Sequence, residues 1–178
     1  MPYYEINHSI SLSDEQREKL AQAITAVHVQ AFKTPSLFVN VRFVKEDLSQ
    51  GNVFVGGKRE TKKSNSITSY VRTSASRTKE DFDKVAKSIE DAWYATVGDE
   101  AVSSAEHPYL GAKEDVRLHA IGLLPIVTAR EAGFTIPTAG EEKQWIGQQL
   151  PVFQKLAQNG ESSFVTLLEE VKRASQQA

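Results

Sequence analysis

The sequence contains no cysteine, and its only methionine is the first residue. Without cysteine the chain has no disulfide framework, no thiolate nucleophile and no cysteine ligand for a metal. The histidines stand too far apart in the sequence to predict a zinc site: His8, His28, His107 and His119. We therefore expect the protein to work without a metal or another cofactor.

The chain also lacks a surplus of charge of one sign and long apolar runs. Its 21 lysines and arginines against 23 aspartates and glutamates give a formal net charge of −2. Binding to a phosphate backbone needs a basic surface, so nucleic acid is not an expected partner. No apolar stretch reaches the length that spans a bilayer, and no signal peptide is visible, so we expect no membrane partner and a cytoplasmic location. A small anionic substrate needs only one or two local cations and stays compatible with this composition.

The first third of the chain shows a strand-helix-strand pattern. Polar and apolar residues alternate over residues 2–7, as in a short strand. Ser13, followed three residues later by Gln16, predicts a helix start, and apolar residues at helical spacing extend this helix to about residue 32. Residues 37–44 are rich in β-branched and aromatic side chains and predict a second strand.

The same pattern occurs a second time. Residues 66–73 predict a strand, Thr78 a helix cap, and residues 115–121 a closing strand. The helix between them has an apolar stripe: Phe82, Val85, Ala86, Ile89 and Trp93. Two successive β-α-β units predict an α+β fold with one sheet and both helices on one face, because crossovers between parallel strands are right-handed. The other face of that sheet needs a cover, which favours an oligomer.

The remaining segments connect these units or follow them. The glycine-bearing residues 51–57 predict a hairpin, the charged residues 58–63 a solvated turn, and residues 98–113 a loop insertion. After Pro125 the composition changes, with chain breakers at Gly133, Pro137, Gly140 and Pro151 and helical patterns around residues 145–156 and 164–171. We therefore expect one core, residues 1–125, and a C-terminal extension, residues 126–178, whose short helices pack on the core or on a neighbouring subunit.

Three stretches of the sequence occur in the order and at the spacing of a known family. A proline follows the first methionine and leads directly into the first strand. The motif AITAVH, residues 23–28, is followed by GNVFVGG, residues 51–57. The motif GLLP, residues 122–125, continues without a gap to EAG, residues 131–133, and then to Pro137 and Trp145. Together these stretches cover about residues 2–145, and the chain resembles the tautomerase superfamily, in particular enzymes of the cis-3-chloroacrylic acid dehalogenase type.

The resemblance implies an assembly and a set of catalytic residues. Members of the family form homotrimers and use the amino group of an N-terminal proline as acid or base, without a cofactor. By this resemblance Pro2 is the catalytic proline, and His28 and Glu131 position or activate water. Either role of Pro2 requires removal of Met1, because the proline nitrogen is otherwise an amide without a basic lone pair.

The resemblance also implies how a small carboxylate substrate is held. Dehalogenases of this type carry two arginines three residues apart, and this chain has Ser74 where the first is expected. Arg77 matches the second, Arg72 is the expected substitute for the first, and Tyr70 is an expected further contact near them. A guanidinium is the natural bidentate partner of a carboxylate. The tyrosine of the family's last strand aligns with Ala120, so the superfamily is better supported than efficient dehalogenation.

The chemistry of Pro2 can be tuned in two directions, since an α-amino group titrates near about 7.7–8.0. An apolar pocket favours the neutral amine, which takes a proton next to a carbonyl, as in a tautomerase. A neighbouring carboxylate such as Glu131 favours the cation, which donates a proton during hydration or dehalogenation. We expect an enzyme that hydrates or dehalogenates small unsaturated or 2-oxo carboxylates. Enol–keto tautomerisation is the first alternative, and a non-catalytic oligomer of the same fold is the second.

Overall fold

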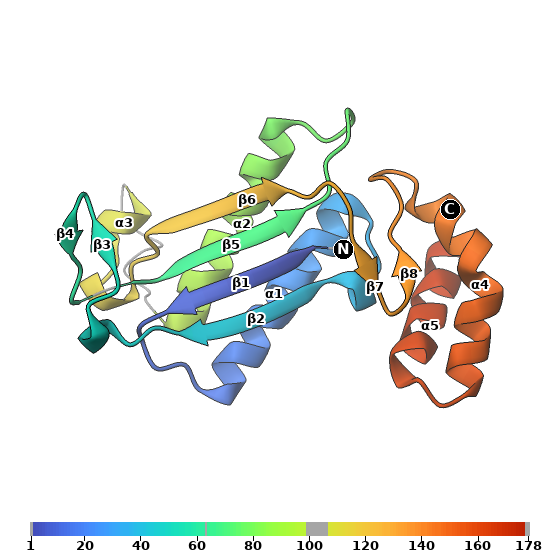
Figure 1. Cartoon of the computed structure of the whole chain (residues 1–178), viewed down its shortest axis with the longest axis horizontal. Helices are drawn as coiled ribbons and strands as arrows, with labels where there is room; N and C mark the ends of the chain where they lie inside the picture. The colour runs from blue at the N-terminus through green and yellow to red at the C-terminus, as the bar shows by residue number, and fades with distance from the viewer. Residues whose placement is uncertain (1, 63, 99–106, 177–178) are drawn as a thin grey trace.

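The computed structural model describes residues 2–62, 64–98 and 107–176, and a four-stranded sheet lies at its centre (Figure 1). The strands are β1 (Tyr3–His8), β2 (Asn40–Lys45), β5 (Ser66–Val71) and β6 (Ala120–Pro125). Their order is β2-β1-β5-β6, with two parallel outer pairs and an antiparallel central pair, β1 and β5. The sheet therefore joins two β-α-β units side by side, which confirms the α+β fold predicted from the repeat.

Both long helices of these units lie on the same face of the sheet, as predicted (Figure 1). They are α1 (Asp14–Phe32) and α2 (Lys79–Val97). Each begins with a capping box, in which Ser13 exchanges hydrogen bonds with Gln16 and Thr78 with Asp81. These reciprocal bonds satisfy N–H groups that the first helical turn leaves without partners, and both predicted caps are confirmed.

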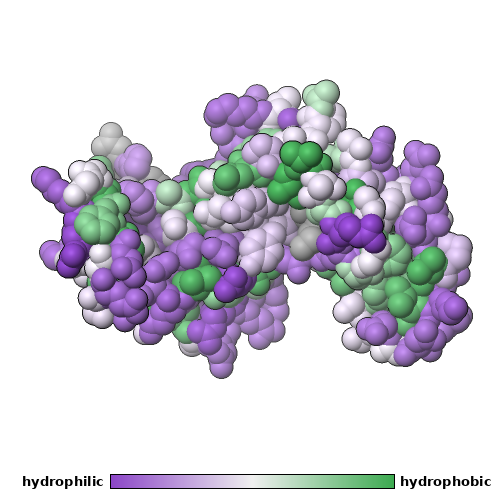
Figure 2. Space-filling view, in the orientation of Figure 1, coloured by the Kyte–Doolittle hydropathy of each residue, from purple (hydrophilic) through white to green (hydrophobic). Residues whose placement is uncertain are grey.

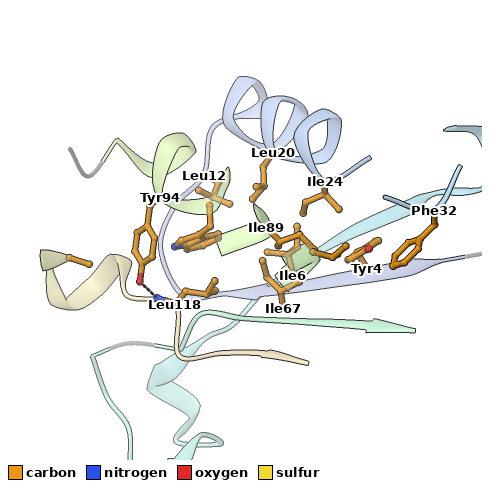
Figure 3. Packing of buried hydrophobic residues seen from close by; sticks show 13 residues of the cluster. Tyr4, Ile6, Leu12, Leu20, Ile24, Phe32, Ile67, Ile89, Tyr94 and Leu118 are labelled. Carbon is orange, nitrogen blue, oxygen red and sulfur yellow. Dashed lines mark hydrogen bonds between the residues drawn. The ribbon is translucent and has the colours of Figure 1, made fainter. Parts of the chain in front are cut away.

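A hydrophobic core fills the space between the sheet and the two helices (Figure 3). Alternate residues of β1, Tyr4 and Ile6, are fully buried, and Ile24 of α1 and Ile89 of α2 join the same cluster. Burial of each such side chain stabilises the fold by roughly 1.5–3 kcal/mol. Figure 3 shows Tyr4 and Phe32 at one end of this cluster, and both contact the polar residues of the candidate site.

The second strand starts later than its composition indicates. Residues 36–38 form a 3₁₀ turn, η1 (Ser36–Phe38), and β2 begins only at Asn40. Phe38 is 3% exposed and packs with residues of the C-terminal extension instead of the main core. Burial of Phe38 against the C-terminal extension outweighs the strand preference of residues 37–39.

The closing strand is displaced as well, because it runs over residues 120–125 and not over 115–121. Residues 114–116 form a 3₁₀ turn, η4 (Glu114–Val116). Asn65 Nδ2 donates to the carbonyl of Asp115 at 2.7 Å, and Trp93 Nε1 donates to that of Val116 at 2.8 Å. Side chains thus satisfy the backbone of this segment, and the ladder begins only after it.

The predicted hairpin is confirmed between β3 (Phe54–Val55) and β4 (Lys58–Arg59), after a 3₁₀ turn, η2 (Leu48–Gln50). Gly56 and Gly57 adopt φ of 57° and 75°, the positive values that a two-residue hairpin turn requires. The predicted turn 58–63 is wrong at its start, since its first two residues belong to β4. The predicted loop insertion 98–113 lies partly outside the described residues, and its end contains α3 (Pro108–Gly111).

The C-terminal extension lies beyond the edge of the sheet where β5 and β6 end (Figure 1). It consists of the hairpin β7 (Arg130–Glu131) and β8 (Phe134–Thr135), followed by α4 (Glu142–Gln158) and α5 (Ser162–Gln176). A second hydrophobic cluster has four buried members: Phe38, Phe153, Phe164 and Leu167. Phe38 comes from the expected core region, so the extension completes its packing with that region. The division after residue 125 stays a prediction.

Pro151 was expected to break the chain, but it lies inside α4. A proline within a helix lacks one hydrogen bond and costs about 3 kcal/mol. Trp145 precedes Pro151, Phe153 follows it, and both belong to the second hydrophobic cluster. Burial of apolar side chains on both sides of Pro151 offsets that cost, so the helix continues.

The face of the sheet opposite the helices is open. Tyr70 and Leu124 are each 42% exposed on it. Figure 2 shows apolar groups among polar ones on this face, and a hollow between the sheet and the helical extension. Among the described residues, no helix has both the length and the apolar character needed to cross a membrane.

Candidate functional site

The predicted site residues gather at one edge of the sheet, where Tyr70 pairs with Tyr3 but faces the open side. The parallel strands β1 and β2 begin at this edge, and β5 and β6, which run the opposite way to β1, end there. Pro2 precedes β1, Arg72 follows β5, and Glu131 lies in β7 shortly after β6. The two β-α-β units thus bring residues from distant parts of the sequence to one place, beside the N-terminus marked in Figure 1.

Pro2 and Glu131 are linked through Asn40. Pro2 is buried, and its carbonyl accepts a hydrogen bond from the backbone N–H of Asn40 at 3.1 Å. The side-chain Nδ2 of Asn40 donates to Oε1 of Glu131 at 2.8 Å. Glu131 is held in a tight hairpin in which Ala132 and Gly133 adopt φ of 47° and 84°. One asparagine at the start of β2 therefore places the predicted proline and the predicted carboxylate together.

The carboxyl of Glu131 is suited to hold a proton. Its Oε2 atom is buried and has no hydrogen-bond partner among the described residues. Burial raises the pKa of Glu131, and the hydrogen bond from Asn40 opposes this shift only in part. A carboxyl group with a raised pKa and a free oxygen near the buried Pro2 is a candidate for acid–base chemistry.

His28 lies in the core and is neutral. It is 2% exposed, and its Nδ1 lies 2.7 Å from the hydroxyl oxygen of Tyr4. Burial lowers the pKa of His28 to about 3, and the positive charge of Arg77 acts in the same direction. Burial also raises the pKa of Tyr4, so its phenol stays protonated and shares a hydrogen bond with the neutral imidazole. A structural histidine would have this arrangement, and the predicted action of His28 on water stays a prediction.

Arg72 and Arg77 lie together, as predicted for a carboxylate-binding pair. The carboxylate that they bind belongs to the protein itself and is that of Glu142. Nη2 of each arginine donates to the same atom, Oε1 of Glu142, and each distance is 2.8 Å. Arg72 Nη1 also donates to the carbonyl of Pro137 at 2.7 Å, and the guanidinium of Arg77 stacks on Phe32 at 4.6 Å from the ring centre. The side chains of both arginines are 9% exposed.

Glu142, in the first turn of α4, is held by several groups at once. Its second oxygen, Oε2, accepts from the backbone N–H of Gly140 at 2.7 Å. Burial alone would raise the pKa of Glu142, but backbone hydrogen bonds and the charges of Arg72 and Arg77 outweigh burial and keep this pKa below its ordinary value. The Glu142 carboxylate is therefore ionised at neutral pH, and the cluster carries two positive charges against one negative charge.

Tyr70 lies apart from this cluster. Its side chain is on the open face of the sheet, and its ring stacks with Tyr3 at a centroid distance of 6.4 Å. Within the described residues, Arg72 and Arg77 donate to Pro137, Glu142, Phe32 and the carbonyl of Arg72, and not to Tyr70. Ser74, which stands in place of the family's first arginine, bonds to the hydroxyl of Ser76 at 3.0 Å. The structure thus brings together Arg72 and Arg77 and leaves Tyr70 outside their site.

A small cavity borders the arginine cluster. It lies between η1, the end of β5 and α4, and its free space of about 10 Å³ has room for about one water molecule. Thr34, Arg72 and Glu142 line it together with apolar side chains, and the buried hydroxyl of Thr34 has no partner among the described residues. A larger open groove runs between β8 and α4, but it is lined by none of the predicted site residues. Nowhere in the described ranges do three His, Asp or Glu side chains gather as a metal site requires.

Sequence reasoning missed Asn40, Tyr4 and Glu142. Asn40 is an uncharged polar residue within the apolar and aromatic segment that predicts the second strand, which was a usable signal. The partners of Glu142 are 70 and 65 residues away in the sequence, and a carboxylate after a glycine turn reads as a solvated helix start. Nothing in the local sequence indicates its contact with the arginines.

Comparisons with known proteins agree with this fold. Residues 1–149 match a family described as "Putative oxalocrotonate tautomerase enzyme". Among solved structures, N1, a member of the cis-3-chloroacrylic acid dehalogenase family, is 17% identical with a TM-score of 0.59, and the match covers 92% of this chain and 98% of that chain. MIF2 of Leishmania major is 15% identical with a TM-score of 0.54, covering 76% of this chain and 97% of that one.

A third similar structure is entitled "F6 fused 4-OT wild type asymmetric trimer". It is 16% identical with a TM-score of 0.53, and the match covers 75% of this chain and 94% of that chain. At these identities the three structures support the fold alone. A search of curated proteins finds no significant match.

Proposed function

Because the chain belongs to the family of oxalocrotonate tautomerase-type enzymes, we propose that its buried Pro2 transfers protons on a small unsaturated or 2-oxo carboxylate, without a cofactor. The observation that carries this proposal is the link through Asn40. Its backbone N–H donates to the carbonyl of Pro2, and its side chain donates to Glu131. An amine and a carboxyl of raised pKa in one buried place are the two groups that acid–base catalysis needs.

Enol–keto tautomerisation is the reaction that this site supports best. After removal of Met1, the neutral nitrogen of Pro2 takes the hydroxyl proton of an enol acid. The oxygen electron pair forms the keto C=O bond, the C=C electrons move to carbon, and that carbon takes a proton back from the prolinium. The reaction is an isomerisation, since no atom is gained or lost. Buried surroundings favour the neutral amine that starts it.

Hydration or dehalogenation of a 3-haloacrylate-like substrate is the second candidate. The observation that favours it is the buried Oε2 of Glu131, which has no partner among the described residues and is free to accept a hydrogen bond from water. An ionised Glu131 would also favour the prolinium, which donates a proton to the substrate carbon. In this reaction His28 would orient water, as the resemblance implies, and halide leaves only when water has added.

We also propose that the protein is a homotrimer. Tyr70 and Leu124 on the open face of the sheet give partner subunits an apolar contact. Three similar structures, the F6, R7 and Q0 fused 4-OT proteins, are trimers. Burying this face between subunits would cover the second side of the sheet.

The first experiment measures the intact mass of the purified protein and then its activity on phenylenolpyruvate and on cis- and trans-3-haloacrylates. Pro2→Ala should lower kcat by about 10²–10⁴-fold, the range that general acid–base groups contribute. An alanine inserted before Pro2 should abolish activity, because it turns the proline nitrogen into an amide. Pro151→Ala is the matched control, since Pro151 is exposed in α4, far along the chain from the site.

Each result decides one step. Activity on phenylenolpyruvate alone identifies a tautomerase, and halide release from a haloacrylate identifies the second candidate. If Pro2→Ala and the inserted variant are as active as the wild type, Pro2 is not catalytic. If the wild type with Met1 removed acts on none of these substrates, the non-catalytic oligomer becomes the better hypothesis.

A further inference from the structure

The arginine pair is already occupied by a carboxylate of the same chain. Both guanidinium groups converge on one oxygen of Glu142 at 2.8 Å, and Gly140 binds the other oxygen. A substrate carboxylate held by the same arginines would need the same position. Two carboxylates cannot share it, because their charges repel each other in a nearly dry site.

The cluster requires one anion but does not require that anion to be Glu142. Two guanidinium groups that are each 9% exposed lie next to each other, and without a counter-ion they would destabilise the fold. Either Glu142 or an external carboxylate can supply the negative charge. Occupation by one therefore excludes the other without leaving the arginines unpaired.

The position of Glu142 allows it to move without unfolding the extension. It lies in the first turn of α4, and Glu141 before it makes no side-chain cap hydrogen bond. Gly140 has a φ of 99°, a turn conformation that favours glycine. The second hydrophobic cluster holds α4 from Trp145 onward, so the residues before Trp145 can move while the rest of the helix stays packed.

The small cavity beside Glu142 offers space and a further polar group to an incoming ligand. Its wall is mostly apolar, with Phe38 and Ile146 among the lining residues. The hydroxyl of Thr34 is buried there without a partner among the described residues. Withdrawal of Glu142 would enlarge this cavity and leave Thr34 free to bind a second carboxylate oxygen. These features fit a small monocarboxylate with a short apolar remainder.

We propose that Glu142 is a tethered competitor of the substrate carboxylate and sets the affinity of the arginine pair for it. The inference rests on the carboxylate substrate class of the proposed function, but it is independent of the role of Pro2. If Glu142 occupies the arginines in about nine of ten molecules, the apparent affinity for an external carboxylate is about tenfold lower than that of the open pair. Ligand binding and opening of the first turn of α4 are then one coupled equilibrium.

The test measures the binding of benzoate, an unreactive carboxylate, by calorimetry, with benzamide as the uncharged control ligand. Glu142→Gln should bind benzoate at least about tenfold more tightly than the wild type. Glu141→Gln, which makes the same change one residue earlier, should bind like the wild type. The same comparison in the Pro2→Ala background should give the same ratio, so failure of the proline mechanism and failure of this inference can be told apart.

Hydrogen exchange on the wild type gives a second test that needs no variant to fold. Benzoate should speed exchange of the Gly140 amide, because it displaces the Glu142 carboxylate to which this amide donates at 2.7 Å. If Glu142→Gln binds benzoate no more tightly than the wild type, or if bound benzoate leaves this exchange unchanged or slower, the proposal is wrong. The ion pairs would then be a structural joint between the sheet and the extension.

Discussion

The protein should lose stability between pH 7 and pH 5, and replacing His28 by asparagine should make this loss much smaller. In the folded chain His28 is 2% exposed and its pKa is lowered to about 3. In the unfolded chain it returns to about 6.5. Between these two values the unfolded state binds a proton that the folded state does not, so stability falls as pH falls through this range.

The magnitude follows from the two pKa values. At pH 7 the histidine is nearly neutral in both states and contributes little to the pH dependence. At pH 5 the unfolded histidine is almost fully protonated, and the linkage relation gives a loss of about 2 kcal/mol relative to pH 7. Asparagine keeps a hydrogen-bonding group near the position of Nδ1 for the hydroxyl of Tyr4 but does not titrate. The variant should therefore show a pH dependence smaller by about 2 kcal/mol, whatever its stability at pH 7.

Urea unfolding at pH 5, 6 and 7, at one fixed protein concentration, measures this difference. The variant must be compared with the wild type because other groups also change stability with pH. Burial raises the pKa of Glu131, so the contribution of Glu131 to the stability of the fold increases as pH falls, opposite to that of His28. His119→Asn is the control, since His119 is exposed. The reasoning is refuted if His28→Asn and wild type lose the same free energy between pH 7 and pH 5, because His28 would then accept its proton in the folded state.

Two further predictions concern the site and the assembly. If the reaction is hydration with an ionised Glu131, Asn40→Ala should move the acidic limb of the kcat/KM profile to higher pH, because the hydrogen bond that lowers the pKa of Glu131 is lost. The exposed Asn52→Ala should leave the profile in place. Light scattering after size exclusion should give three times the chain mass of 19.7 kDa. Leu124→Arg on the open face should reduce that mass and Leu110→Arg on α3 should not, and a monomeric wild type would contradict the trimer.

The sequence predicted the elements that local chemistry determines. Ser13 and Thr78 begin their helices with capping boxes because a hydroxyl and a side chain three residues later act within one turn. The glycine pair at 56 and 57 specifies a hairpin turn for a similarly local reason. Two successive β-α-β units allow few arrangements of the strands in one sheet, so the α+β fold class could be predicted from the repeat.

Elements that depend on distant partners were predicted less well. The residues around Phe38 in the sequence prefer a strand, but Phe38 lies outside the sheet because residues more than a hundred positions later bury it. The start of the closing strand depends on Asn65 and Trp93, which bind the backbone before it. In each of these cases a side chain far away in the sequence competes with a local preference of about 1 kcal/mol or less, and tertiary contact prevails.

Arg72 joins the two findings that sequence reasoning kept separate, the missing arginine at Ser74 and the unexplained extension. Its guanidinium is fixed by the carbonyl of Pro137 and the carboxylate of Glu142, and both groups belong to residues after 125. Without them Arg72 would bring a buried charge and no acceptor to the site, which is strongly unfavourable. The substitute arginine therefore depends on the extension for its position. Glu142 holds Arg72 by its negative charge, and the same charge must compete with any substrate carboxylate for Arg72. Positioning of the arginine and competition at the site are therefore two consequences of the contact between Arg72 and Glu142.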